Sequence, residues 1–241
     1  MEIEVYESVE AVSEAAAQYI CRTAQEAVLK NGHFLVALAG GRTPNLLYRR
    51  LAEQPYCSIM PWQQTFVFWG DERFVPPSHI DSNYGTAWLQ LFRKIDISSE
   101  HIYPIPTILT NPDNSAILYE QMIRRAFTSL SATQFDLTLL GMGDDGHTAS
   151  LFPGREAVAE RVRWVVPTEN PAGQQRLSLT LPVLNESKQI LFLVTGVEKQ
   201  VMLQKVANAQ GQELKQYPAA MIRGRARTLW MVDSAAYESQ A

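Results

Sequence analysis

Short apolar runs alternate with longer segments of helical period along the chain. The apolar runs are rich in Val, Leu, Ile and Phe at successive positions rather than at every second position. Such runs are typical of strands that are buried on both faces, as in a sheet covered by helices on two sides. The strands expected from this pattern span residues 34–39, 65–69, 135–140, 162–166, 188–195 and 228–232.

The segments between these strands carry helix signals. One apolar stripe runs from Val9 to Ala27 at helical spacing and is followed by Asn31-Gly32, a common helix stop. Further helices are expected over residues 44–52, 82–94, 112–130 and 197–207. The alternation of strands and helices predicts an α/β fold with a largely parallel sheet and helices on both faces. No repeat or linker divides the chain, so residues 1–241 are expected to form a single domain.

The composition excludes several classes of function. The 241 residues are 46% hydrophobic and 19% charged, as in ordinary globular proteins rather than disordered ones. The 21 basic and 25 acidic residues give a net charge of -4, whereas nucleic-acid-binding domains usually carry a basic excess. We therefore expect no nucleic-acid partner, and a local basic pocket for a small anion is compatible with this charge.

The chain carries no sign of secretion or membrane insertion. Its N-terminal MEIEVYESVE is acidic, whereas a signal peptide begins with basic residues. The apolar runs 34–39 and 190–194 are far shorter than a membrane span. Cys21 and Cys57 lack a metal-binding spacing, which favours two free thiols in a reducing compartment. A cytoplasmic protein without a membrane partner is expected, and its oligomeric state is left open between a monomer and an assembly.

Four of the predicted strands end in glycine-rich or charged sequence. Ligands of open α/β sheets bind beyond the carboxyl ends of the strands, so parallel strands would bring these four ends to one edge. The four segments are AGGRTP (39–44), GDER (70–73), GMGDDGHT (141–148) and TGVEK (195–199). The sequence therefore predicts one site that is built from these loops.

The first of these loops has the features of a phosphate-binding turn. Gly40, Gly41, Arg42 and Thr43 lie between a predicted strand and a helix N-terminus. Glycines let backbone N–H groups turn toward an anion, and the helix dipole favours negative charge there. The GxxxxGK[ST] spacing of a P-loop is absent, so a small phosphate group fits better than a nucleotide. A tight turn with an ordinary helix cap explains the same residues.

The GMGDDGHT segment contains a GxGxxG pattern after a strand, which occurs in dinucleotide-binding turns. Glu169 lies roughly where an acidic residue would bind the ribose of such a cofactor. Asp144 and Asp145 oppose this interpretation, because they would repel a pyrophosphate inside the turn.

The same segment makes better sense as an acid–base element. The unperturbed pKa of a histidine lies nearest neutrality, and Asp145, two residues before His147, is placed to orient or tune it. A histidine that only satisfies a hydrogen bond of its loop is the alternative.

Charged residues provide the remaining candidates. Asp71, Glu72 and Arg73 follow a buried strand, where they form either a solvated turn or part of a site. The planar guanidinium of Arg73 is suited to binding an anion or stabilising an oxyanion. Arg176 and Lys199 are candidate phosphate partners, since a lysine near a helix N-terminus opposes the helix dipole unless an anion is bound.

Other catalytic templates are missing from the sequence. There is no GxSxG nucleophile elbow and no HExxH or comparable metal-ligand cluster. A general-base reaction on a phosphorylated small molecule, without a metal, is what these residues favour.

Long motifs in this order resemble the glucosamine-6-phosphate isomerase/6-phosphogluconolactonase family, and within it the 6-phosphogluconolactonases. The most specific stretch is GMGDDGHTASLFPG, supported by GDERFVPPSHIDSNYG, RLSLTLPVLN and FLVTGVEK. The resemblance implies a Rossmann-like fold of the isomerase/deaminase type. It also implies hydrolysis of 6-phospho-D-glucono-1,5-lactone to 6-phosphogluconate, in the oxidative pentose phosphate pathway, without metal or organic cofactor.

The resemblance also implies roles for individual residues. His147 is the expected base that activates water, and Asp145 orients it or holds sugar hydroxyls. Arg73, in the motif that also contains Asp71 and Glu72, is the expected electrophilic or phosphate-contacting group. The phosphate loop falls on residues 40–43, with Arg176 and Lys199 supplying positive charge. Arg42 stands where many members have a small hydroxyl residue.

Two other functions compete with this one. A sugar-phosphate isomerase or deaminase of the same fold typically continues the histidine segment with Ile-Ala-Phe-Asn-Glu, whereas this chain reads Thr148-Ala149-Ser150-Leu151-Phe152. A non-catalytic sugar-phosphate sensor would keep the phosphate loop but lose the acid–base pair, which this chain retains.

Overall fold

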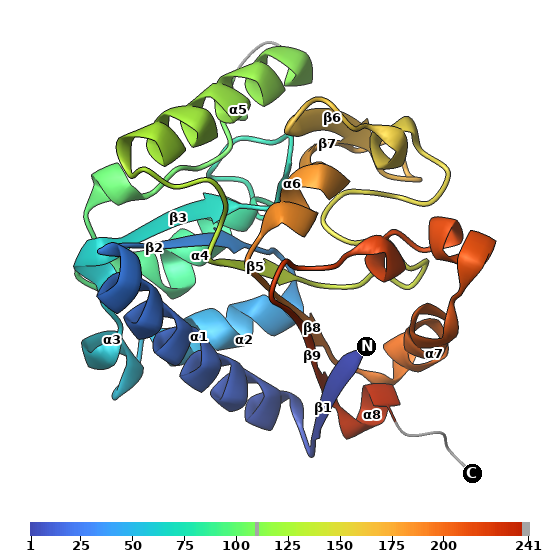
Figure 1. Ribbon diagram of the computed structural model, residues 1–241, viewed down its shortest axis with the longest axis horizontal. Helices are drawn as coiled ribbons and strands as arrows, with labels where there is room; N and C mark the ends of the chain where they lie inside the picture. Colours follow the sequence, from blue (N-terminus) through green and yellow to red (C-terminus); the bar gives the residue numbers. More distant parts are fainter. Residues whose placement is uncertain (109–110, 238–241) are drawn as a thin grey trace.

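The computed structural model describes residues 1–108 and 111–237 (Figure 1). The strands are β1 (Glu2–Tyr6), β2 (Phe34–Leu38), β3 (Thr65–Trp69), β4 (Asp71–Arg73), β5 (Leu137–Leu140), β6 (Val165–Glu169), β7 (Gln175–Leu179), β8 (Gln189–Val194) and β9 (Arg227–Asp233). The helices are α1 (Val9–Asn31), α2 (Arg42–Leu51), α3 (Tyr56–Ile59), α4 (Asn83–Gln90), α5 (Pro112–Ser129), α6 (Leu181–Glu186), α7 (Gln200–Asn208) and α8 (Ser234–Tyr237). Short 3₁₀ turns connect several of them, including η5 (Val197–Lys199).

The main sheet has six strands in the order β1-β9-β8-β5-β2-β3, and every ladder in it is parallel. Helices α1 and α2 lie on one side of this sheet, and α5 and α6 lie on the other (Figure 1). The predicted α/β class, with a largely parallel sheet between two helical layers, is therefore confirmed.

A second, antiparallel sheet of three strands, β4-β7-β6, corrects one part of the prediction. The run 162–166 was expected in the main sheet, but its strand begins at Val165 and pairs with β7 instead. Val165 and Val166 are buried, so their apolar character indicates a strand without indicating which sheet it joins. The small sheet matters for function because β4 follows β3 after one glycine and carries the Asp71–Arg73 segment.

The N-terminal strand β1 was missing from the predicted elements. None of its residues is buried, because it is an edge strand that pairs with β9 alone. An edge strand lacks the continuous apolar run by which buried parallel strands are recognised.

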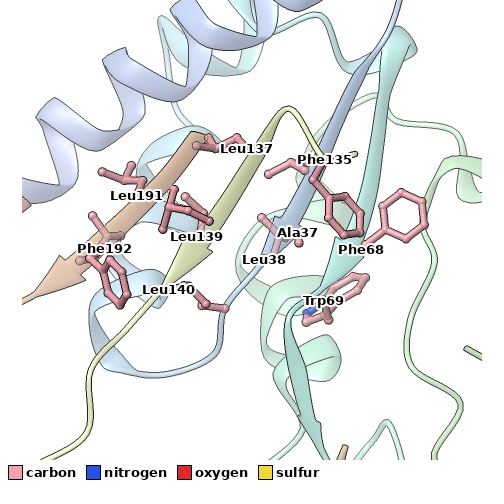
Figure 2. Close-up of a cluster of buried hydrophobic side chains, with 14 of the residues drawn as sticks. Ala37, Leu38, Phe68, Trp69, Phe135, Leu137, Leu139, Leu140, Leu191 and Phe192 are labelled. Atoms are coloured by element: carbon pink, nitrogen blue, oxygen red, sulfur yellow. The ribbon is translucent and has the colours of Figure 1, made fainter. Parts of the chain in front are cut away.

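The core lies on both faces of the main sheet. All residues of β2 and β5 are buried, and side chains of β2, β3, β5 and β8 pack together across the sheet (Figure 2). Trp69 and Phe68 of β3 are fully buried there. These strands form a rigid support for the loops that follow their carboxyl ends.

Cap residues explain where the helices begin and end. Ser8 accepts a hydrogen bond from the N–H of Ala11 at the start of α1, and Gly32 ends the helix with a φ of 80°. Ser82 caps α4 in the same way. The expected helix over 82–94 is shorter in the structure, since α4 ends at Gln90 and a 3₁₀ turn follows. No helix within the described ranges is both long and apolar enough to cross a membrane.

Candidate active site

The four polar strand ends meet at one edge of the main sheet. Strands β8, β5, β2 and β3 are neighbours and run parallel, so the loops after their carboxyl ends lie side by side. This arrangement is the one that the sequence predicted from the strand ends.

The loop after β2 and the turn after β8 enclose a cavity of about 530 Å³. Gly40, Gly41 and Thr43 line it from one side, and Gly196 and Lys199 line it from the other. The hydroxyls of Thr43 and Thr195 lie 2.6 Å apart and join the two loops. Gly41 has a φ of 112°, a conformation that residues with a Cβ rarely adopt, and it precedes the N-terminus of α2. The cavity therefore offers backbone N–H groups and hydroxyls of the kind that bind a phosphate.

Three cations line this cavity, Arg42, Arg49 and Lys199, and Arg49 is exposed. The Arg42 side chain is 92% exposed and binds Glu198 at 3.0 Å, so it extends toward solvent. The Lys199 side chain is only 20% exposed and forms an ion pair with Asp144 of the histidine loop. Lys199 is thus the better placed cation for a ligand in the cavity.

The Asp145–His147 pair lies on the loop after β5. Nδ1 of His147 lies 2.6 Å from Oδ1 of Asp145, and the same oxygen accepts the backbone N–H of His147 at 3.0 Å. Partial burial acts to raise the pKa of Asp145, but these hydrogen bonds outweigh it and the pKa is lowered. Asp145 is therefore ionised at neutral pH, so Nδ1 donates the proton and Nε2 keeps the lone pair that a general base needs.

Gly143 makes room for this pair. A Cβ at Gly143 would lie 2.0 Å from Nδ1 of His147 and 2.8 Å from Oδ1 of Asp145. The loop also closes on itself, because the N–H of Gly143 donates to the carbonyl of His147. The glycines of this segment thus serve the acid–base pair, and no pyrophosphate turn is required to explain them.

One face of the small sheet is turned toward the histidine loop. Asp71 pairs with Ser178 and Arg73 pairs with Arg176 across the β4–β7 ladder, so these four residues share a face. Ser150, from the histidine loop, donates through its hydroxyl to Asp71 at 2.6 Å, and its N–H donates to Ser178 at 3.2 Å. Asp71 is buried, and this contact fixes the loop against the small sheet.

Arg176 occupies a different place from the one expected. It was predicted to accompany Lys199 at the phosphate, but it does not line the cavity beside Lys199. Its guanidinium carbon instead lies 5.9 Å from the ring centre of Phe152, and that ring lies 4.5 Å from the ring of His147. The position of Arg176 is set by the register between β4 and β7. Because these strands are distant in sequence, the local sequence does not indicate this register.

Glu72 binds backbone groups of two neighbouring elements. It is buried, and its carboxylate accepts the backbone N–H groups of Arg73, Asn83 and Tyr84. Burial raises the pKa of Glu72, and these backbone donors act in the opposite direction. The carboxylate therefore joins β4 to the N-terminus of α4, and its expected contact with substrate stays a prediction.

Asn83 is a site residue that sequence reasoning missed. Its amide packs against Gly40, where a Cβ would lie 1.7 Å from Oδ1, and its Nδ2 donates to the carbonyl of Asp71 at 2.9 Å. Its Oδ1 is buried and has no hydrogen-bond partner. Asn83 thus links the glycine loop to β4, and only its position after the helix cap marked it in the sequence.

No metal-binding cluster is found in the described part of the chain, where no group of three His, Cys, Asp or Glu side chains converges. The chemistry available at this edge comes from a histidine–aspartate pair, arginines, a lysine and backbone N–H groups.

Comparison with known proteins identifies the family of the chain. The model of the glucosamine-6-phosphate isomerases/6-phosphogluconolactonase family matches residues 7–230. The chain belongs to this family. Among its curated relatives, the 6-phosphogluconolactonase of Nostoc sp. is 40% identical over 215 residues, covering 87% of this chain and 86% of the relative. The 6-phosphogluconolactonase of Synechocystis sp. is 38% identical over 224 residues, covering 91% of each.

A solved structure of a family member has the same fold. The 6-phosphogluconolactonase of Thermotoga maritima superimposes with a TM-score of 0.83 at 31% identity, covering 96% of this chain and 99% of the other. Family membership thus extends over nearly the whole chain, the edge of the sheet that carries the candidate site included.

Proposed function

We propose that this protein hydrolyses 6-phospho-D-glucono-1,5-lactone to 6-phospho-D-gluconate, the lactonase step of the oxidative pentose phosphate pathway. The observation that carries the proposal is the 2.6 Å contact between His147 and an ionised Asp145, at the sheet edge that also holds the glycine loop. Relatives that are 38 to 40% identical to the chain bear the name 6-phosphogluconolactonase.

In the proposed reaction His147 acts as the general base. Its Nε2 takes a proton from a water molecule, and the water oxygen forms a bond to C1 of the lactone. Asp145 stabilises the imidazolium that results. The C1–O5 bond then breaks, and the imidazolium returns its proton to O5, so that one water is consumed and a hydroxy acid is formed. The balance requires neither an oxidant nor a metal.

Two cationic regions flank this pair. Arg73 stabilises the negative charge that develops on the carbonyl oxygen as water adds, since a fixed guanidinium suits a forming oxyanion. At the other end, the backbone of Gly40 and Gly41, the Thr43 hydroxyl and Lys199 bind the 6-phosphate. Arg42 contributes long-range positive charge from its exposed position.

The proposal extends to the domain organisation and location of the protein. Residues 1–241 act as one domain, and the enzyme works in the cytoplasm without an organic cofactor or metal. In support, the structure has two free cysteines, one of them buried.

The test is hydrolysis of freshly generated 6-phosphogluconolactone near neutral pH, measured against its spontaneous rate. Unphosphorylated gluconolactone serves as the matched control for the phosphate site. Acceleration of the phosphorylated lactone alone is expected. Ammonia release from glucosamine 6-phosphate in place of lactone hydrolysis would assign the site to the deaminase branch, and binding without either reaction would assign it to a sensor.

A further inference from the structure

We infer that Arg73 and Arg176 together form a subsite for the oxyanion and the product carboxylate, at the lactone end of the substrate and separate from the phosphate loop. The inference rests on the proposed function and assigns Arg176 to a different end of the substrate from Lys199.

The first observation is the juxtaposition of two like charges. Arg73 and Arg176 are direct partners in the antiparallel β4–β7 ladder, so their side chains leave the sheet on the same face. Such a pair destabilises a sheet unless something compensates the charge. Burial lowers the pKa of Arg176; Asp71 opposes this change, whereas the neighbouring Arg73 adds to it.

The second observation is that only neutral groups bind the two guanidinium groups within the described residues. Arg73 donates to the backbone carbonyl of Asp81 at 2.6 Å, and Arg176 donates to the side-chain oxygen of Gln174 at 2.8 Å. The Nε atoms of both arginines are buried and have no hydrogen-bond partner. Two buried donors that belong to adjacent cations are suited to an anion that the ligand brings.

The nearby carboxylates have other partners. Asp71 accepts the hydroxyl of Ser150, and Glu72 accepts backbone N–H groups at the start of α4. Oδ2 of Asp81 lies 3.8 Å from Nδ1 of His79. By contrast, two of the three cations that line the phosphate cavity have carboxylates beside them, Glu198 for Arg42 and Asp144 for Lys199, and the third, Arg49, is exposed. The arginine pair is therefore the part of the site that most needs an added negative charge.

The position of the pair assigns it to the lactone end. The ring centre of Phe152 lies 5.9 Å from the guanidinium carbon of Arg176 and 4.5 Å from the ring centre of His147, and Phe152 belongs to the same loop as the histidine. A group bound by the arginines thus lies beside the base that activates water. During the reaction this is where negative charge develops on the carbonyl oxygen, and afterwards the carboxylate of the product occupies the same place. Planar guanidinium groups bind a carboxylate through paired donors, which a lysine cannot do.

The test compares two ligands that differ at one end. 6-Phosphogluconate carries a phosphate and a carboxylate, whereas glucitol 6-phosphate carries the phosphate alone. Their dissociation constants are measured by calorimetry for the wild type, R176Q, R176K and K199Q. R125Q, which changes an exposed arginine of α5, serves as the control.

In R176Q we expect the affinity for 6-phosphogluconate to fall about tenfold or more, and that for glucitol 6-phosphate to stay within about twofold. R176K is expected to recover only part of the loss, and K199Q to weaken both ligands alike. Retained binding of glucitol 6-phosphate also shows that each variant is folded. An equal loss of both ligands in R176Q would return Arg176 to the phosphate, and no loss of either would remove it from the site. Because these are binding measurements, a wild type that failed to hydrolyse the lactone would reject the proposed function without deciding this question.

Discussion

A single carboxylate oxygen of Asp145 holds both the ring and the backbone of His147. Oδ1 lies 2.6 Å from Nδ1 of the ring and 3.0 Å from the backbone nitrogen of the same residue. The second contact fixes the loop, and the first fixes the tautomer. The pair is therefore organised before any substrate arrives.

Replacement of His147 tests the base directly. H147A is expected to lower kcat by about 10² to 10⁴, the usual contribution of a general base. Binding of 6-phosphogluconate should largely survive, because the phosphate loop and the arginine pair are unchanged. H33Q, at the opposite end of β2, is the matched control and should keep wild-type turnover. Turnover near that of the wild type in H147A would exclude His147 as the base.

Asp145 gives a prediction about pH and stability. Because its pKa is lower in the folded protein, the ionised carboxylate stabilises the fold above the unfolded pKa, and this contribution is lost as the pH falls through the folded value. D145N is therefore expected to unfold at lower urea concentration than the wild type near pH 7. The difference should shrink below about pH 4. D96N, at an exposed aspartate, is the control, and a difference for D145N that did not depend on pH would contradict the argument.

Two glycines of the same loop provide a matched pair of variants. In G143A the added methyl group would overlap His147 and Asp145, whereas nothing lies within 4 Å of a Cβ at Gly141. Neither glycine has a positive φ, so the comparison isolates the steric effect. We expect kcat of G143A to fall at least about tenfold, as a small displacement of a catalytic group commonly causes, and G141A to retain wild-type kcat. Equal kcat values in the two variants would show that Gly143 is not needed to place the histidine.

Lys199 and Arg42 are expected to contribute unequally to phosphate binding. K199Q should raise KM about tenfold or more, since it removes a charge-assisted hydrogen bond from a partly enclosed cation. R42Q should change KM no more than about twofold, because Arg42 is almost fully exposed and its charge is screened. KM measured at low and high salt separates the two, and an R42Q effect as large as that of K199Q would refute this ranking.

Local signals predicted much of the fold. Gly32 marked the end of α1, and the buried run of β3 was placed at its observed residues, because caps and continuous apolar runs are properties of neighbouring positions. Strand β1 was not predicted, because an edge strand needs no continuous apolar run. The small sheet was not predicted, because an apolar run such as 162–166 indicates a buried strand but does not indicate which strand it pairs with.

In the site, too, local sequence predicted some positions, and partners distant in sequence determined the others. Strand-end position brought together the glycine loop, Arg73, His147 and Lys199, since parallel strands share one edge. The position of Arg176 away from Lys199 could not be predicted, because it depends on the register of Arg176 with Arg73. The role of Glu72 was also missed, since nothing in the sequence shows that its charge is used by backbone N–H groups.

The pairing of β1 with β9 has a consequence for how the chain is made. Glu2 lies opposite Leu229, and Arg227 binds Glu2 across 225 positions of sequence. During synthesis β1 leaves the ribosome first, but it cannot join the sheet until β9 has been made. Strands β2, β3 and β5 can pair with one another earlier. Closing this long loop comes late and costs chain entropy, so a nascent chain halted before residue 227 should hold a partly built sheet with a free N-terminal segment.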